Sequence, residues 1–506
     1  MTLAPVEPSS SGTTKIVIAA GAVVIVQAAC FVYFLNRFSY LPGADAYYYA
    51  VQTQSLVDFG HLKVADGGVL HYFLAALCRC GMPIAMAFKA ALAAIFCVYN
   101  LGVLLVVLRL RQNARLAALV LWLIGGPAVA FHVIEFPELS LGLALVPLWF
   151  WLLASSFKRR TLWLAVALAA SAMTHVAAAA LALLFAAVAL AASARVHGRR
   201  RKRPAMTTVL LGFAACAAVL IAVALKWTSL KLRLAALRPG APGIVALTTS
   251  ADIPVDMKFT LLVFWLFVLV LFVLSFSGEA GKWKYLSAAT LALPLWPSHE
   301  AGLAGLGGRL AALFVFPALP LAMQMCDEFA PRLNFAPLFR RSLGWVLALS
   351  AAAGVAFLPA RLSHYDGLLM SDDYTAYEKV VSTLRKADIP MLIAHRGLDF
   401  FYSYRLGRDA FHFDPEPEWK RAEIWRVAMR ITPEEVAYYS PPSCPWGETA
   451  RSIPGTDYIL VREDCWEQLR ARIQQSDNPD LYVEVWGNME NPSQPRPRFL
   501  RLRHAN

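Results

Sequence analysis

Long apolar runs alternate with short polar segments over the first 360 residues, and this pattern predicts membrane-spanning helices. Several runs reach the roughly 20 residues that a helix needs to cross a bilayer core about 30 Å thick. With about eleven such runs, the expected fold class is a polytopic α-helical membrane protein. The fifth and sixth runs are short and meet at His175, so they form either one helical hairpin or partly re-entrant segments. The predicted spans are residues 16–36, 83–108, 115–133, 139–156, 161–175, 177–194, 206–226, 259–277, 284–297, 309–325 and 342–360.

The composition agrees with a membrane location. Of 506 residues, 58% are hydrophobic and only 16% are charged, whereas soluble globular proteins average roughly 25% charged residues. The net charge of +13 does not by itself indicate nucleic acid, because basic residues gather in the cytoplasmic loops of membrane proteins. The sequence has no nucleic-acid-binding motif, so no nucleic-acid partner is expected.

The distribution of Lys and Arg predicts the orientation of the chain. A cytoplasmic N-terminus, with residues 1–15 as a disordered polar tail, puts the basic segments "RLRQNAR", "KRR", "RVHGRRRKR" and "KWK" on the cytoplasmic side. The opposite turns near Glu135, His175 and His299 carry almost no basic residues before Arg309. An odd number of spans then places the C-terminal part outside the cytosol.

The composition changes after the membrane part, which is expected to cover residues 16–364. Within residues 365–506, "TAYEKVVSTLRKADIPMLIAHRG" reads as a helix followed by a strand, and "GTDYILVREDCWEQLRARI" as a strand followed by a helix. "LYVEVW" and "RPRFLRLR" are typical of strands. We therefore expect a soluble α/β domain on the outer side, where Cys444 and Cys465 could pair.

The stretch "DAYYYAVQTQSLVDFG" follows the first span and opens the first outer loop, residues 37–82. Residues 46–59 have helical apolar spacing but are too short to cross a bilayer, so we expect a helix at the membrane interface with its tyrosines at headgroup level. Spacings of four and three residues put Asp45, Tyr49 and Gln52 on one face. The alternative is that Asp45 only caps the helix.

Ionisable residues recur at the same depth in the other outer turns. They lie in "HVIEFPEL", "AMTHV" and "WPSHEAGLAGLGGR". Because ionisable groups at membrane borders are costly to bury, they tend to face a cavity and a partner. The pattern favours one shared site over separate helix caps. The residues are Glu135, Glu138, His175, His299, Glu300 and Arg309.

Four of these motifs together resemble the GT-C superfamily of membrane glycosyltransferases. "DAYYYA" resembles its Asp-Tyr-Tyr signature, "EFPE" is similar in place to its second acidic motif, and "MTHVAAAALAL" resembles a Thr-His helix start of bacterial members. "GGRLAALFVFPALPLA" resembles their late span with an outer Arg. The resemblance implies a polyprenyl-phosphate-sugar donor and inversion at the anomeric carbon. The absence of a WWD-type motif disfavours en bloc transfer to asparagine, and Glu-x-x-Glu replaces a tight Asp-x-Asp.

The resemblance implies a role for each candidate. A sugar hydroxyl needs a carboxylate to take its proton, and Asp45 is the expected base, with Glu135 and Glu138 as further catalytic residues. Alternatively, Asp45 holds Mg²⁺ or Mn²⁺ together with Glu135 or Glu138. A guanidinium matches phosphate oxygens, so Arg309 is the expected phosphate ligand. Weaker candidates are His175, His299 and Lys231 for the phosphate, and Tyr48, Tyr49 and Glu300 for the sugar; the tyrosines and Lys231 also suit lipid headgroups.

Other functions remain open. A transporter or flippase would show internal repeats and broken spans with charges near the midplane. An O-antigen ligase or polymerase would need a dominant outer loop with Arg and His, and residues 227–258 lack His. A sensor would need a larger cytoplasmic part. The expectation is a transferase of a bacterial inner membrane, which contacts membrane lipids and passes sugar to a glycan, lipid or protein hydroxyl.

Overall fold

The chain forms two compact units, Met1–Leu369 and Met370–Asn506, close to the boundary predicted at residues 364–365. In this computed structural model, the second unit is described only in short segments. The described residues are 10–37, 40–43, 45–63, 68–155, 159–198, 241–249, 255–277, 281–298, 306–329, 381–382, 392–393, 398–407, 410–411, 425–428, 438, 450–452, 459–462, 468–469, 471–472, 475 and 483–485.

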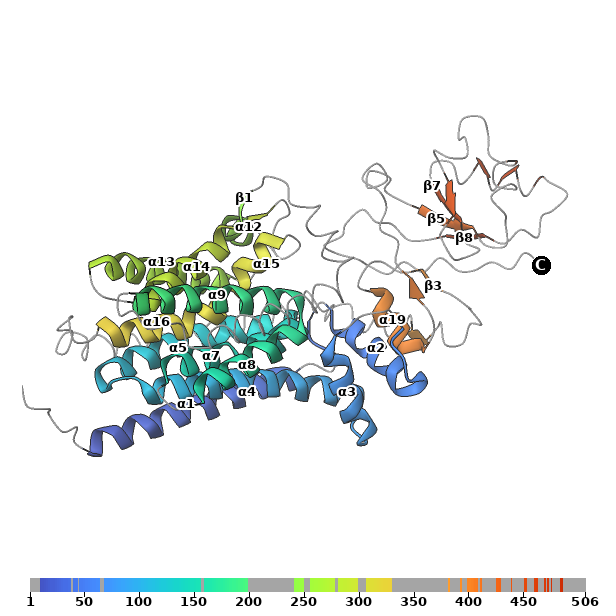
Figure 1. Cartoon of the computed structure of the whole chain (residues 1–506). Helices are drawn as coiled ribbons and strands as arrows, with labels where there is room; N and C mark the ends of the chain where they lie inside the picture. The colour runs from blue at the N-terminus through green and yellow to red at the C-terminus, as the bar shows by residue number, and fades with distance from the viewer. Residues whose placement is uncertain are drawn as a thin grey trace, which may run out of the picture. The chain divides into compact units, whose positions relative to one another are not determined.

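The first unit is a bundle of apolar helices (Figure 1). Within the described residues, six helical segments are long and apolar enough to cross a membrane, so the chain is a helical, multi-pass membrane protein. Shorter apolar helices accompany them. The six segments are Val17–Arg37, Ile84–Arg109, Ala117–Glu135, Pro137–Ala154, Met257–Leu274 and Gly308–Phe329.

Nine of the eleven predicted spans overlap described helices, but only six of these nine fall on the segments long and apolar enough to cross a membrane. The predicted spans 161–175, 177–194 and 284–297 do not, and residues 206–226 and 342–360 lie outside the described residues. The helices of the first unit are α1 (Ser10–Arg37), α2 (Ala46–Phe59), α3 (Val69–Arg79), α4 (Ile84–Arg109), α5 (Gln112–Glu135), α6 (Pro137–Leu143), α7 (Val146–Ala154), α8 (Arg160–Thr174), α9 (Val176–Gly198), α12 (Gly243–Thr249), α13 (Val255–Leu274), η1 (Ser275–Ser277), α14 (Gly281–Ala292), η2 (Leu293–Leu295), α15 (Leu306–Leu313) and α16 (Val315–Phe329).

Prolines explain where the helical pattern is interrupted. Pro147 lies in the first turn of α7, where its missing N–H costs no helical hydrogen bond. The run predicted at residues 139–156 is therefore divided into α6 and α7. Pro317 is the third residue of α16 and also lies in its first turn, so α16 starts as a helix separate from α15. Two two-residue strands of this unit, β1 (Ala241–Pro242) and β2 (Pro297–Ser298), pair antiparallel.

Buried polar side chains tie α4, α5 and α16 together in the interior. The Trp122 indole N–H donates to Asn100 Oδ1 over 2.6 Å, and the Asn100 amide donates to the Phe96 carbonyl over 2.8 Å. The Tyr99 hydroxyl donates to the Phe316 carbonyl over 3.4 Å. An apolar surrounding gives these groups no water as an alternative partner, so the bonds also fix the helix register.

Arginines bind helix C-termini at one end of the bundle, here called the arginine end. Arg115 donates to the Leu108 and Leu110 carbonyls over 2.9 and 2.7 Å. Arg109 and Arg160 both donate to Ser155, just past the end of α7. Cations beside C-terminal carbonyls oppose the helix dipole, so these arginines have a structural role.

The second unit contains strands and helix α19 (Leu398–Leu406). Its larger described sheet has the antiparallel order β6-β7-β5-β8, and β3 pairs parallel with β4. Strands β3, β7 and β8 fall within predicted strand segments, whereas β5 and β6 were not predicted. Cys444, Cys465 and the "RPRFLRLR" segment lie outside the described residues. The strands are β3 (Leu392–Ile393), β4 (Ala410–Phe411), β5 (Trp425–Ala428), β6 (Ala450–Ser452), β7 (Ile459–Arg462) and β8 (Val483–Val485).

A pair of tryptophans tests the buried hydrogen bond between α4 and α5. Trp122 and Trp149 are both 0% exposed, but the Trp149 indole N–H has no hydrogen-bond partner among the described residues. Both Trp→Phe changes remove similar volume, and only Trp122→Phe leaves Asn100 without its donor. We expect Trp122→Phe to lower the free energy of unfolding by about 1 kcal/mol more than Trp149→Phe. Denaturant titration in mixed micelles measures this difference, and equal losses would contradict the assignment.

Candidate functional site at the motif end

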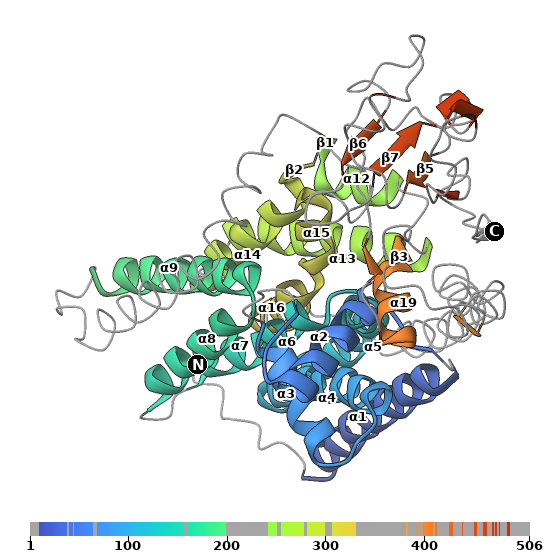
Figure 2. The same ribbon diagram turned by 90° about the vertical axis from the view of Figure 1, so that its right-hand side faces the viewer.

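The predicted site residues gather at the end of the bundle opposite the arginine end, here called the motif end. It comprises residues 40–43, Asp45, α2, α3, the α5–α6 turn, the α8–α9 turn and the start of α15. Figure 1 shows α2 and α3 at this end, and Figure 2, which looks onto it, shows them in front of α4 and close to α6. Segments far apart in the sequence therefore meet here.

A glycine attaches the first loop to the end of α5. Gly43 has a φ of +108°, and a Cβ atom on it would lie only 2.4 Å from the Ile134 carbonyl oxygen. Only glycine tolerates both the left-handed backbone and this approach. The contact brings the segment that carries Asp45 against the residue that precedes Glu135.

The "EFPE" sequence explains the α5–α6 turn. A residue before proline is disfavoured in the helical region, and Phe136, which precedes Pro137, has φ −134° and ψ 64°. The chain bends without losing its ladder, since the Phe136 N–H donates to the His132 carbonyl and the Ser140 N–H donates to the Phe136 carbonyl, both over 2.9 Å.

The two glutamates of this turn are buried, with Glu135 6% and Glu138 4% exposed. The Glu138 carboxylate lies against Gly68, where a Cβ atom would come within 2.7 Å of its Oε1. Gly68 is the N-cap of α3, and the N-terminus of a helix favours a negative charge. Glu138 thus anchors the far end of the first loop onto α6.

Asp45 is exposed at the N-cap position of α2. No side-chain hydrogen bond joins its carboxylate to the first turn of α2, all of which the structure describes. The interpretation of Asp45 as a helix-capping side chain is therefore wrong. Tyr49 and Gln52 are buried, so the three residues expected on one face do not reach a common surface.

The tyrosines of α2 pack against a histidine that the sequence pattern did not single out. His71 of α3 is buried, with its ring centroid 5.7 Å from that of Tyr48 and 5.2 Å from that of Tyr49. Tyr49 also stacks on Phe88 of α4 at 6.0 Å. Tyr49 is thus inside the protein, contrary to a headgroup position. Tyr48 is half-buried and accepts a hydrogen bond from Gln52 over 3.1 Å.

The α8–α9 turn packs beside α6. His175 ends α8, and its Nδ1 accepts a hydrogen bond from the Ala177 N–H over 3.0 Å, so a neutral His175 carries its proton on Nε2. A Cβ atom on Gly142 of α6 would lie 2.2 Å from Thr174 Oγ1. His175 is also within electrostatic range of His132.

Arg309 of α15 lies over the α5–α6 turn. Its Cζ is 5.7 Å from the centroid of the Phe136 ring, within cation–π range. His132, also missed as a site residue, packs on Phe136 with ring centroids 5.1 Å apart. Its position in "HVIEFPEL", three residues before Glu135, was the available signal.

Most of the predicted site residues fall within the described part of the chain. The motif end brings together the loop that carries Asp45 and four residues of other segments, Glu135, Glu138, His175 and Arg309. Lys231, His299 and Glu300 lie outside the described residues. In the described part of the chain, no group of three or more His, Cys, Asp or Glu side chains gathers as metal ligands.

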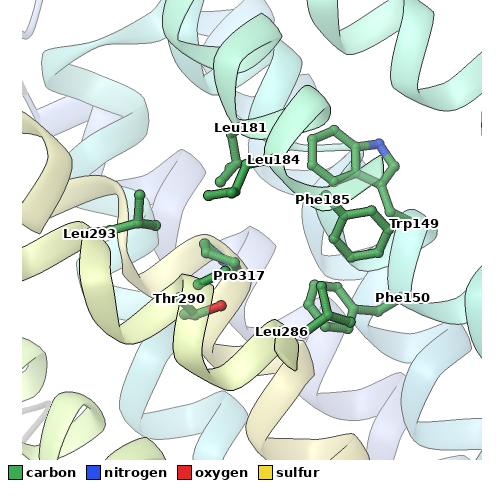
Figure 3. Close-up of a pocket in the computed structure, with 10 residues that line it drawn as sticks. Trp149, Phe150, Leu181, Leu184, Phe185, Leu286, Thr290, Leu293 and Pro317 are labelled. Atoms are coloured by element: carbon green, nitrogen blue, oxygen red, sulfur yellow. The ribbon is translucent and has the colours of Figure 1, made fainter. Parts of the chain in front are cut away.

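An apolar cavity lies inside the bundle among α7, α9, α14, η2 and α16 (Figure 3). Trp149, Phe150 and Phe185 line one side of it, and Pro317 lies opposite. Leu184 in its wall is 38% exposed, so the lining reaches the bundle surface. Its lining contains no ionisable side chain, which separates it from the polar site.

No protein-family model matches the chain, and no curated protein matches it.

Two glycines test the attachment of the first loop. Gly43 and Gly60 both have positive φ, +108° and +77°, but a Cβ atom on Gly60 meets nothing within 4 Å. Gly43→Ala adds the collision with the Ile134 carbonyl to the backbone strain. We expect it to lower the free energy of unfolding by about 2 kcal/mol more than Gly60→Ala. The melting temperatures of the purified variants measure this, and matching values would contradict the contact.

Proposed function

We propose that the chain is an inverting glycosyltransferase that moves a sugar from a polyprenyl phosphate to a hydroxyl group of an acceptor. The observation that carries the proposal is the meeting of carboxylates, histidines and an arginine from four separate segments at the motif end. In this proposal the motif end faces the periplasm of a bacterial inner membrane. About eleven spans, a cytoplasmic N-terminus and a periplasmic α/β domain complete it.

Asp45 is the proposed general base. Its carboxylate is exposed at the start of α2 and does not cap that helix, so an acceptor can reach it. The acceptor oxygen bonds to the anomeric carbon as the bond from that carbon to the phosphate oxygen breaks. The hydroxyl proton passes to Asp45, and polyprenyl phosphate leaves with the bonding electrons.

Arg309 is the proposed ligand of the leaving phosphate. Negative charge grows on the phosphate as the glycosidic bond breaks, so a fixed guanidinium lowers the barrier. His175 is a second donor, because its Nδ1 accepts the Ala177 N–H and a neutral ring then carries its proton on Nε2. A hydrogen-bond donor and a cation at the same end of the bundle suit a phosphate ester.

The two glutamates have different proposed roles. The contact of Glu138 with Gly68 favours a positioning role, since it ties the first loop to α6. Glu135 is the better candidate to accept hydrogen bonds from sugar hydroxyls. Mg²⁺ or Mn²⁺ would require oxygen ligands that converge, and the described residues offer no such group of three. No step is therefore assigned to a metal.

An apolar cavity lies close to the proposed site. It is lined by aromatic and aliphatic side chains, but at about 20 Å³ it has room only for a water-sized group and not for a prenyl chain. Its wall residue Pro317 directly follows Phe316, whose ring centroid is 5.0 Å from that of His132. A donor with its phosphate at the motif end would thus have an apolar region close by.

A transporter or flippase is less well supported. Its binding site would be formed by broken helices near the midplane. Pro127 and Pro320 leave α5 and α16 continuous. Two candidate spans are interrupted, between α6 and α7 and between α15 and α16, but the residues at these breaks, Ala144, Leu145 and Phe314, carry no ionisable side chain. The described candidate residues with ionisable side chains lie at helix ends instead.

The base is tested with two aspartates at opposite ends of α2. Asp45→Asn keeps the shape and removes the proton acceptor, so we expect sugar transfer to fall by about 10²- to 10⁴-fold. Asp58→Asn is the matched control, because Asp58 bonds to Gln54 near the far end of the helix. Transfer of radiolabelled sugar from a polyprenyl-phosphate sugar in nanodiscs measures both. Transfer at the wild-type rate by Asp45→Asn would remove Asp45 from the mechanism.

The phosphate ligand is tested at Arg309. We expect Arg309→Ala to lower kcat/KM by about 10²-fold or more, since leaving-group charge loses its partner. Arg309→Lys keeps the charge without the planar fork, so its kcat/KM should lie between those of wild type and Arg309→Ala. Unchanged kinetics in Arg309→Ala would show that the phosphate binds elsewhere.

A further inference from the structure

The ring of Phe136 lies between two other site residues. Arg309 Cζ is 5.7 Å from its centroid, and the His132 ring is 5.1 Å from it. The three side chains come from α15, from α5 and from the turn between α5 and α6. Neither Phe136 nor His132 has a role in the proposed chemistry, so the contact of Phe136 with the arginine needs another explanation.

His132 is held by two hydrogen bonds to Ser140. The Ser140 hydroxyl donates its only proton to the His132 carbonyl over 3.1 Å. Its oxygen therefore accepts from the His132 Nδ1–H, over 2.9 Å. This fixes the tautomer and the plane of an imidazole that is fully buried.

The backbone of Phe136 is fixed as well. Pro137 restricts it, and both its N–H and its carbonyl are hydrogen-bonded within the turn. Its ring therefore has a defined place, with the fixed imidazole of His132 beside it.

We propose that Phe136, supported by His132, is a positioning residue that holds the Arg309 guanidinium in place for the lipid phosphate of the donor. The inference rests on the proposed function and adds residues to the same site. An arginine side chain loses rotamer entropy when it is fixed, so a preset guanidinium binds phosphate more tightly. An aromatic ring takes the face of a guanidinium, whereas phosphate oxygens bind at its edge.

The test compares substitutions of Phe136 in full-length protein in nanodiscs. The probe is a polyprenyl monophosphate, and the measurements are its dissociation constant and the KM and kcat for the sugar-loaded donor. We expect Phe136→Leu to raise the dissociation constant and KM by about 3- to 20-fold, from loss of the cation–π contact. Phe136→Tyr keeps an aromatic face and should stay within about 2-fold of wild type.

Phe264→Leu is the matched control. Phe264 of α13 is a fully buried phenylalanine that packs toward Gly125 of α5. Loss of the Phe264 ring should lower the melting temperature without changing the dissociation constant for polyprenyl monophosphate. If Phe136→Leu does not fold, Phe136→Met, which keeps a similar volume without a ring, replaces it with the same expected result.

Measurements on wild type and Arg309→Ala distinguish a failure of the positioning role from a failure of the proposed function. If wild type binds the polyprenyl phosphate and Arg309→Ala does not, but Phe136→Leu or Phe136→Met binds like wild type, the positioning role is overturned and the proposed function stands. Weak binding by Phe136→Tyr equal to that of Phe136→Leu would also overturn it. If folded wild-type protein neither binds the lipid nor transfers sugar, the proposed function itself fails.

Discussion

The contact between Gly43 and the Ile134 carbonyl is the constraint on which the motif end depends. It brings the loop after the first span onto the end of α5, directly beside the turn that carries both glutamates. Glu138 makes the second attachment, at Gly68. These two close approaches add to the packing of α2 on α3 and α4, where Tyr49 stacks on Phe88. Two glycines and one carboxylate thus convert a surface loop into one side of a site.

The two ends of the bundle use charge differently. At the arginine end, Arg109, Arg115 and Arg160 donate to backbone oxygens or to Ser155 where helices stop. They stabilise the helix termini. At the motif end, Arg309 instead lies over an aromatic ring. The environment of an arginine, more than its presence at a helix end, separates a structural cation from a candidate ligand for phosphate.

The buried polar groups also divide into two sets. Asn100 and Trp122 satisfy each other inside the bundle, and such pairs specify how helices pack. The pair of His132 and Ser140 is similarly satisfied, but it lies beside Phe136 and Arg309. We infer that the same kind of interhelical bond serves packing in one place and the geometry of a site in the other.

The sequence by itself determined the elements that depend on local chemistry: apolar runs became helices, and proline before "EL" set the α5–α6 turn. It also selected the turns that carry Asp45, Glu138, His175 and Arg309, because ionisable groups are confined to the ends of apolar helices. It did not reveal that Tyr49 is buried, because a tyrosine near a span end suits headgroups and a protein interior equally. Only the tertiary structure decided that His71 and His132 pack on site residues, that Glu138 lies against Gly68 at the start of α3 and that Arg309 lies over Phe136. Those contacts join residues far apart in the chain, and no local pattern encodes which helix faces which.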